Sequence, residues 1–448
     1  MHAAAGRFLA PAVVGVALVL SPAIGYANTY VLLIFGAVAA VLCVIGRQPD
    51  APSTTLRVVP LPRFAVEEHL AGSEIPADAR AQRRPDPPTR SGGGGPPEGW
   101  WRGRAGEQQT PTLLFAIAFA LMLISALGAM RQPADLLALV PYLAPLCFLP
   151  FCSLVCQRHW PIARLALIGA AVGLVTALAL RYGIGKPRAG EGAFITDPYR
   201  LSVTTLLCAT LALGGLFTRE RWHWLSLFGL VAAAGTIYLT GSRTTLLGVP
   251  VLLFLTALCF VKRPVTIVAM IAAVAALVVA ALFVELPGKV RMRLWDVAGS
   301  IARGETPADE SIWIRMKLWG DGVRDFWDAP AFGHGWGEWM MSPMRARFPA
   351  DLESLPNIAH MHNDALHFAM AGGVLGIIAW LLLLAAPVAG YLGLPREART
   401  RGRLHAILVL VGGYFALGLA DIMLASPAQL TLYVALTAIV LAPRQATA

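Results

Sequence analysis

Long runs of apolar residues, separated by short polar stretches, dominate the chain. Several runs reach about 20 residues, the length that an α-helix needs to cross a bilayer. The runs are uninterrupted rather than alternating, which favours helices over a β-barrel. The pattern therefore predicts an all-α, polytopic integral membrane protein with about 12 transmembrane helices. We place them at 8–25, 28–46, 112–130, 134–156, 162–180, 200–217, 223–240, 244–261, 264–285, 364–391, 404–424 and 427–442.

The composition fits this class. Of 448 residues, 57% are hydrophobic and only 14% are charged, and the mean hydropathy is +0.63. All six cysteines fall in apolar segments, so we interpret them as buried small hydrophobic side chains rather than disulfide partners or metal ligands. The chain has no GxxxxGK phosphate-binding loop, so nothing in it indicates the use of ATP.

Two polar segments divide the apolar runs. Residues 47–110 are rich in Pro, Gly and Arg, cannot bury a core, and are predicted to be a disordered linker. The linker follows an N-terminal helix pair at 1–46, whose first run looks like a signal peptide; because a second run follows at once, we expect a retained anchor helix. Segments 111–285 and 364–448 form the membrane core, and 286–363 is one large loop between them.

The arginine distribution predicts the orientation of the chain. The stretch "LGLPREARTRGR" at 392–403 carries four arginines between two spans and should be cytoplasmic. Alternation then places the 47–110 linker and both termini inside, and the loops 181–199 and 286–363 outside, in the periplasm. Loop 181–199 is cationic although it faces outward, which suggests that it holds an anion.

The large loop 286–363 contains six of the 12 tryptophans and one amphipathic pattern. Ile312, Met316, Trp319, Val323 and Phe326 follow a 4-3-4-3 spacing. This spacing predicts a helix that lies on the membrane surface or packs over the bundle. Its tryptophans could anchor the membrane interface or stack on sugar rings, and the pattern leaves both possibilities open.

The segment "HNDALHFAMAGGVLG" at 362–376 carries the main chemical motif. His362 and Asn363 are followed, after nine residues, by Gly373-x-x-Gly376. This arrangement resembles the signature of the O-antigen ligase and polymerase superfamily.

Three further stretches are similar to motifs of the same family, in the same order. "TGSRTTLLG" at 240–248, with Ser242 and Arg243, resembles its Ser-Arg motif at the outer start of a central helix. "RAGEGAF", beginning at Arg188, is similar to its arginine-containing outer loop. "WIRMKLWGDGVRDFWDAPAFGHGWG" at 313–337, which includes Arg315, resembles a run in its large periplasmic loop.

Three positions depart from the family pattern. Ala371 stands where the family usually has an acid, His367 where it often has glutamine, and Tyr199 where asparagine is common. These changes are compatible with the family's reaction, and they concern recognition of the acceptor and the branch of the family.

The resemblance implies a glycosyltransferase of the bacterial inner membrane, which moves a glycan from undecaprenyl diphosphate to an acceptor hydroxyl at the periplasmic face. A hydroxyl needs a base, and histidine is suited to that task, so His362 is the candidate. A departing diphosphate needs fixed positive charge, which Arg188 and Arg243 would supply. Residues expected to support them are Asn363, His360, Ser242, Arg315 and Arg200, of which Arg200 competes with Arg188.

No metal and no cofactor are expected. His360 and His362 are two residues apart, with His367 five further on, which is neither an i, i+4 pair nor a Cys–His cluster, and the sequence places no carboxylate set near them. The resemblance implies a metal-independent single displacement that inverts the anomeric carbon. The implied partners are the lipid-linked donor, a lipid A core or glycan acceptor, and membrane lipids, without nucleic acid.

Two alternatives remain beside an O-antigen ligase. A polymerase of O-antigen or exopolysaccharide repeat units would carry the same signature. A secondary transporter could also have 12 spans, but it would place charges near mid-bilayer in repeated halves, whereas the polar motifs here lie at one face. Asp421, near the outer end of a late span, is costly there, and catalytic and structural roles are equally open for it.

Overall fold

The computed structural model describes residues 99–155, 161–182, 197–217, 223–261, 264–282, 310–345 and 359–442, with a few isolated residues between them. All regular secondary structure in these ranges is helical, which confirms the all-α class for this part of the chain. The predicted spans 8–25 and 28–46, most of the linker 47–110 and most of the loop 181–199 lie outside the described residues.

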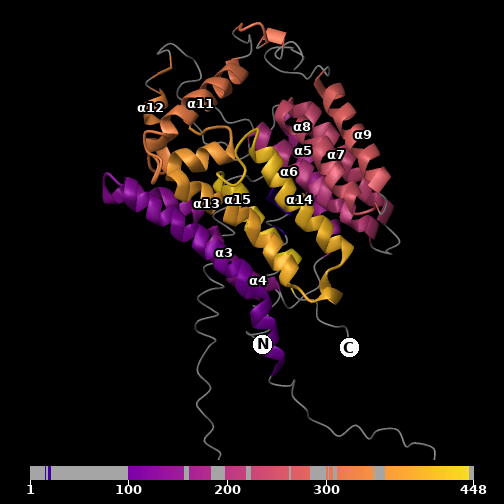
Figure 1. Ribbon diagram of the computed structural model, residues 1–448. Coiled ribbons are helices and arrows are strands. Elements are labelled where there is room, and N and C mark those ends of the chain that lie inside the picture. Colours follow the sequence, from indigo (N-terminus) through magenta and orange to yellow (C-terminus); the bar gives the residue numbers. More distant parts are fainter. Residues whose placement is uncertain are drawn as a thin grey trace, which may run out of the picture.

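The helices follow one another along the chain as shown in Figure 1. The α-helices are α3 (Gly99–Ala129), α4 (Phe148–Val155), α5 (Ile162–Arg181), α6 (Pro198–Ala212), α7 (Phe228–Thr240), α8 (Arg243–Leu258), α9 (Pro264–Leu282), α11 (Glu310–Phe326), α12 (Ser342–Arg345), α13 (Asp364–Gly393), α14 (Arg401–Gly418) and α15 (Pro427–Leu441). Short 3-10 helices are η1 (Pro133–Tyr142), η2 (Ala144–Cys147), η3 (Leu213–Phe217), η4 (His223–Leu227), η5 (Gly337–Met341) and η7 (Arg396–Ala398).

Five of the described helices are long and apolar enough to cross a membrane, or six if the pair Pro133–Tyr142 and Ala144–Cys152, bent by 48°, is one span. The five are Gln108–Ala129, Ile162–Arg181, Pro198–Phe217, His223–Thr240 and Asp364–Gly393. α8 and α15 are apolar but shorter. The described residues thus contain five or six candidate spans, and the total of 12 and the orientation stay predictions.

Helix α3 begins earlier than the sequence analysis predicted. It starts at Gly99, inside the stretch 47–110 that we expected to be disordered. The segment between Pro97 and Pro111 contains no proline, so helical hydrogen bonding can extend back from the apolar span toward the Pro96–Pro97 pair, where proline disfavours it.

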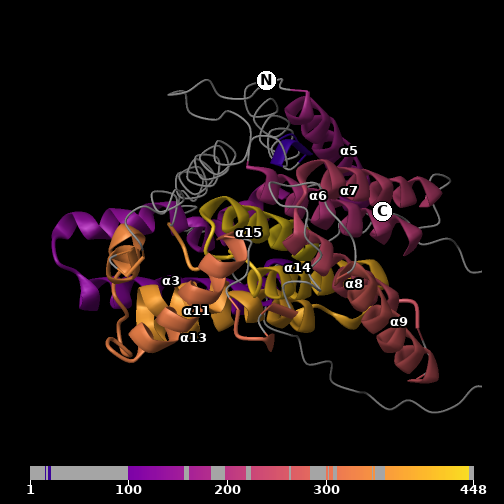
Figure 2. The ribbon, with the colours of Figure 1, turned by 90° about the horizontal axis from the view of Figure 1, so that it is seen from above.

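The helices form two groups joined by α14 (Figures 1 and 2). α3 packs along α13 in one group, and α5, α6 and α7 pack together in the other. α14 contacts α6 and α8 as well as α13 and α15, so it connects the two. The four cysteines in the described ranges, Cys147, Cys152, Cys208 and Cys259, are free and at least partly buried, which agrees with their interpretation as small core residues.

The predicted amphipathic helix is present as α11, but its buried face differs from the prediction. Ile314 and Leu318 are buried together with Asp325, whereas Met316 and Val323 are exposed. The apolar spacing missed this stripe because one of its members is a charged residue, held by an ion pair with Arg347. α11 packs against α13, so of the two predicted placements it lies over the bundle.

Helix α13 is kinked at Gly373, the one residue inside it with a non-helical backbone (φ +62°, ψ −147°). The loop that precedes η5 lies against this kink. The His334 N–H donates to the Met370 carbonyl (2.8 Å), and the Val374 N–H donates to the Pro330 carbonyl (2.8 Å). The loop therefore supplies backbone hydrogen bonds that the kink removes from the helix.

Glycines make this close approach possible. A Cβ atom on Gly373 would lie 2.5 Å from the Ala331 backbone, and one on Gly333 would lie 2.6 Å from the Ala371 backbone. Gly333 also has a positive φ (+71°), a conformation that glycine adopts without steric strain. Gly333, in the triplet Gly333-His334-Gly335, and Gly373, in the Gly373-x-x-Gly376 motif, therefore lie on the two sides of one backbone contact, which we call the glycine contact (330–335 against 370–374).

Candidate active site

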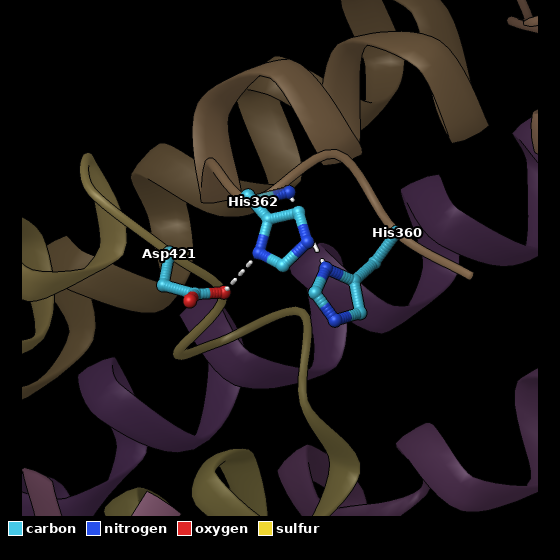
Figure 3. A group of neighbouring side chains, drawn as sticks. All are labelled: His360, His362 and Asp421. Carbon is cyan, nitrogen blue, oxygen red and sulfur yellow. Dashed lines mark hydrogen bonds and ion pairs between the residues drawn. The ribbon is translucent and has the colours of Figure 1, made fainter. Parts of the chain in front are cut away.

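The motif residues His362 and Asn363 lie directly before α13. Asn363 is its N-cap: the side-chain oxygen accepts a hydrogen bond from the Leu366 N–H (3.0 Å), which satisfies a free donor at the helix start. Its Nδ2 donates to the Leu419 carbonyl (2.8 Å). The segment that follows α14 is thereby held next to His362 (Figure 3).

His362 has a left-handed backbone (φ +48°), and no other non-glycine residue in the described ranges has a positive φ. This conformation is uncommon outside glycine and persists only where neighbours fix it. Here the His362 N–H donates to His360 Nδ1 (3.3 Å), and Trp319 Nε1 of α11 donates to the Met361 carbonyl (3.1 Å). The left-handed turn therefore sets the direction of the His362 imidazole, and the bond from Trp319 of α11 holds the turn in place.

The imidazole of His362 is paired with Asp421, as Figure 3 shows. His362 Nδ1 lies 3.0 Å from Asp421 Oδ1. Because a carboxylate accepts, Nδ1 carries the proton and donates, and the lone pair of the neutral ring is on Nε2. The side chain of His362 is 24% exposed, against 5% for Asp421, so the ring can meet a substrate while its partner stays buried.

Asp421 is fixed by two further donors. Arg315 Nη2, from α11, lies 3.2 Å from Oδ2, and the Ile422 N–H donates to Oδ1 (2.8 Å). Burial alone would raise the pKa of the Asp421 carboxyl, but the hydrogen bond from His362 and nearby positive charge, including Arg315, lower it to about 2. Asp421 is therefore a permanent anion beside the ring at ordinary pH.

His360 lies against His362, with ring centroids 4.1 Å apart. Burial, with a smaller contribution from the charge of His362, lowers the pKa of His360 to about 3, so this ring is neutral. Its Nδ1 accepts the His362 N–H, so its proton is on Nε2. His360 thus presents a neutral N–H donor beside the candidate base.

A second carboxylate, Asp364, shapes the segment that carries Asp421. It is fully buried and accepts hydrogen bonds from three consecutive backbone N–H groups, those of Met423 (2.8 Å), Leu424 (2.8 Å) and Ala425 (2.9 Å). These bonds satisfy donors in the irregular stretch between α14 and α15.

The predicted arginines lie at different distances from this centre. Arg315 contacts Asp421 directly. Arg200, at the start of α6, pairs with Asp197 (Nε to Oδ2, 3.1 Å), and its charge acts on His360. Arg188 lies outside the described residues, so its place is untested.

Arg243 begins α8 directly after Ser242. The hydroxyls of Ser242 and Thr245 are 2.7 Å apart, and that of Thr245 is 2.7 Å from the Ser202 hydroxyl of α6. The starts of α6 and α8 are therefore joined by a chain of hydroxyls. This places Ser242 and Arg243 at the end of the bundle where Arg200 also lies.

Two carboxylates of the site were not identified as such from the sequence. Asp421 was left open between a catalytic and a structural role, and Asp364 was not singled out, although it follows the His-Asn pair directly. The expectation that no carboxylate completes the histidine pair was wrong: His360, His362 and Asp421 offer donor atoms within 4.8 Å of one another. This group could not be predicted from the sequence because 58 residues separate His362 from Asp421 in the chain.

The comparisons with known proteins agree with the motifs. The family model for O-antigen ligase matches residues 228–381, a range that holds Arg243, Arg315 and His362 and ends before Asp421. An O-antigen ligase from Pseudomonas aeruginosa is 24% identical over 242 residues, which cover 52% of this chain and 53% of that protein. The chain thus spans about half the length of the curated relative that it matches. The apolar helices are those of a multi-pass membrane protein, and these matches show that the chain is similar to O-antigen ligases over part of its length.

Proposed function

We propose that the protein transfers a glycan from undecaprenyl diphosphate to a hydroxyl of lipid A core, at the periplasmic face of the bacterial inner membrane. The observation that carries this proposal is the 3.0 Å hydrogen bond between His362 Nδ1 and Asp421 Oδ1, which leaves Nε2 free to take a proton. The similarity to an O-antigen ligase, seen in the family match and in the Pseudomonas relative, supports ligase-type transfer.

The proposed reaction is a single displacement. The acceptor hydroxyl gives its proton to His362 Nε2 while its oxygen forms a bond to the anomeric carbon. The bond from that carbon to the diphosphate oxygen breaks, and undecaprenyl diphosphate leaves with the electron pair. Because attack and departure occur on opposite faces, the anomeric configuration inverts. Asp421 keeps the ring oriented and stabilises the imidazolium that forms.

The departing diphosphate needs positive charge, and we assign it to Arg243 and Arg188, with Arg200 as the described alternative to Arg188. Arg315 is a poorer candidate because it is already engaged by Asp421. In this scheme Arg315 acts on the His362–Asp421 pair. Arg200 and Arg243, at the outer ends of α6 and α8, act on the leaving group.

We also propose that the transfer needs no metal, although three ligand atoms lie close together. Both Asp421 oxygens already accept protein hydrogen bonds, and a divalent cation there would meet the fixed charge of Arg315 at 3.2 Å from the same carboxylate. A metal on His362 would also occupy the base. Activity that survives EDTA dialysis supports this; restoration by Zn²⁺ or Mn²⁺ alone would contradict it.

The direct test uses purified protein in liposomes, with an undecaprenyl-diphosphate-linked glycan and lipid A core. Transfer should yield glycan-bearing lipid A core, and the new linkage should have the anomeric configuration opposite to that in the donor, as read by NMR. Retention of configuration would contradict the single displacement, and absence of any transfer would contradict the function.

The chromosomal deletion separates a ligase from a polymerase. A ligase deletion should leave bare lipid A core while long chains accumulate on undecaprenyl diphosphate. Core that bears one repeat unit, or loss of a secreted polymer with unchanged core, would instead identify a repeat-unit polymerase. Either enzyme would use the same base and the same arginines.

A further inference from the structure

We infer that Asp364 is a positioning residue, which sets the His362–Asp421 pair by holding the backbone segment that carries Asp421. This inference rests on the proposed function. It gives a role to the residue that follows the His-Asn pair.

Three consecutive residues contact one segment, 419–425, at three points. His362 pairs with Asp421, Asn363 donates to the Leu419 carbonyl, and Asp364 accepts from the N–H groups of 423–425. The tripeptide 362–364, which contains the proposed base, therefore also binds the backbone before Asp421, at residue 419, and after it, at residues 423–425. The start of α13 therefore fixes the position of the Asp421 carboxylate relative to the imidazole of His362.

The pocket of Asp364 is tightly fitted. Its side chain is fully buried, and a Cβ atom on Gly418, the last residue of α14, would approach Asp364 Oδ2 closely enough to displace it. The segment that Asp364 holds is also fixed by Tyr142, whose hydroxyl donates to the Ala425 carbonyl (2.7 Å). The carboxylate cannot be displaced without a movement of α14 or of the segment it holds.

The segment depends on these bonds because it is not a regular helix. Between Gly418 and Pro427, turn bonds such as Asp421 N–H to the Leu417 carbonyl (3.0 Å) fix its first residues. The buried N–H groups of 423–425 have Asp364 as their acceptor, and without it they would have to find new partners by moving. A shift of the order of 1 Å in a catalytic group can reduce turnover by about 10²-fold.

The test compares Asp364→Asn with the wild type in the liposome transfer assay. Asparagine has the same shape but keeps only one of the two oxygens that accept the three backbone hydrogen bonds. We expect kcat to fall by about 10- to 10²-fold, with KM for the lipid-linked donor within about twofold. Asp321→Asn, at a carboxylate of α11 paired with Lys317 (3.1 Å), is the matched control and should leave kcat unchanged.

A double variant separates positioning from general stability. If Asp364 acts through Asp421, then Asp364→Asn should reduce kcat by less than about threefold in an Asp421→Asn background. A full, independent loss in that background would overturn the inference, as would an unchanged kcat in the single variant. Should Asp364→Asn not accumulate in folded form, Gly418→Ala, which retains the carboxylate and displaces it, takes its place with the same expectations.

Hydrogen exchange measured by mass spectrometry provides a readout independent of transfer. Backbone amides in a peptide covering 421–426 should exchange faster in Asp364→Asn than in the wild type, with no change in peptides from α5. If the wild type transfers no glycan but this exchange difference is present, the proposed function fails and the hold of Asp364 on the segment stands. Unchanged exchange overturns the inference alone.

Discussion

The two ends of α13 carry charged residues that are used in opposite ways. At its start, the acidic groups Asp364 and Asp421 bind backbone N–H groups and the imidazole of His362. At its far end, the cations dominate: Arg399 donates to the carbonyls of Leu392 and Leu394. Arg403, beyond it, donates to the carbonyls of Ala398 and Ala442.

The far end is a case of helix termination. The last carbonyls of a helix have no partner within it, and basic side chains close to the terminus satisfy them. At the start of α13, by contrast, the polar groups are bound to one another in a way that leaves His362 Nε2 open. Charged side chains lie at both ends, so the groups that each charge contacts, rather than the charge itself, distinguish the candidate active site from a helix terminus.

The largest expected effect comes from removal of the proposed base. His362→Asn should reduce transfer by about 10²- to 10⁴-fold, the usual contribution of general base catalysis. Asparagine is preferred over alanine because it tolerates the left-handed backbone of this position, so membrane abundance should stay near that of the wild type. His223→Asn, at an exposed histidine before α7, is the control. A His362→Asn protein with more than half of the wild-type rate would exclude His362 as the base.

The second effect concerns the glycine contact, which supplies backbone hydrogen bonds at the kink of α13. Gly373→Ala places a Cβ in a positive-φ position, 2.5 Å from the Ala331 backbone, so we expect a loss of about 3 kcal/mol or more in stability. Detergent-solubilised protein should melt at a clearly lower temperature.

The control for this variant lies at the opposite end of the bundle. A Cβ added to Gly402, in the first turn of α14, would meet no neighbouring atom within 4 Å. Gly402→Ala should therefore leave the melting temperature unchanged or raise it slightly. Equal melting of both variants would contradict the role of the kink.

Arginines at the two ends provide the third comparison. Arg315→Ala removes the cation beside Asp421, and we expect transfer to fall by about 10-fold, with Arg315→Lys intermediate because it keeps charge without the planar fork. Arg399→Ala removes only a carbonyl cap, so it should keep transfer within about twofold while lowering the melting temperature. The comparison fails if the two alanine variants lose activity to the same degree.

The all-α class was predictable because the length and the uninterrupted pattern of the apolar runs indicate helices directly. Apolar runs predicted helices at 162–180, 223–240 and 364–391, which correspond to α5, η4 with α7, and α13. The motif around His362 and Asn363 was predictable for a different reason: it is local, and its spacing survives without knowledge of the fold.

The pairings were not predictable, because they join distant residues. Nothing in the sequence around Asp421 marks it as the partner of His362. Arg315 was expected to support the site, but nothing in the sequence indicates that it pairs with Asp421. The kink at Gly373 also stayed hidden, since its hydrogen bonds come from Pro330 and His334, about 40 residues away. The glycines of both motifs were visible, but their contact with each other was not.

The smallest expected effect is a pH dependence of stability that comes from His360. Burial lowers the pKa of this ring from 6.5 to about 3, so between these values the unfolded chain binds a proton that the folded protein does not. Stability from this group is therefore complete above pH 6.5 and is lost as the pH falls toward 3. Asp421 remains charged through most of this window, because its pKa is lowered to about 2, and its contribution is lost only below about pH 4. The charge of Arg200 acts in the same direction as burial on His360, and that of Asp421 opposes it.

Glutamine at position 360 can accept the His362 N–H without titrating, so His360→Gln should remove this pH dependence. Melting temperatures in detergent, measured at several values from about pH 7 down to about pH 4, should fall less steeply for the variant than for the wild type, by an amount on the order of 2 °C. At the far end of α13 no matching change is expected, since the arginines there stay protonated throughout this range. Parallel curves for the two proteins would mean that His360 is protonated in the folded protein. In that case it would be a second cation beside Asp421, and the neutral N–H donor assigned to it would be wrong.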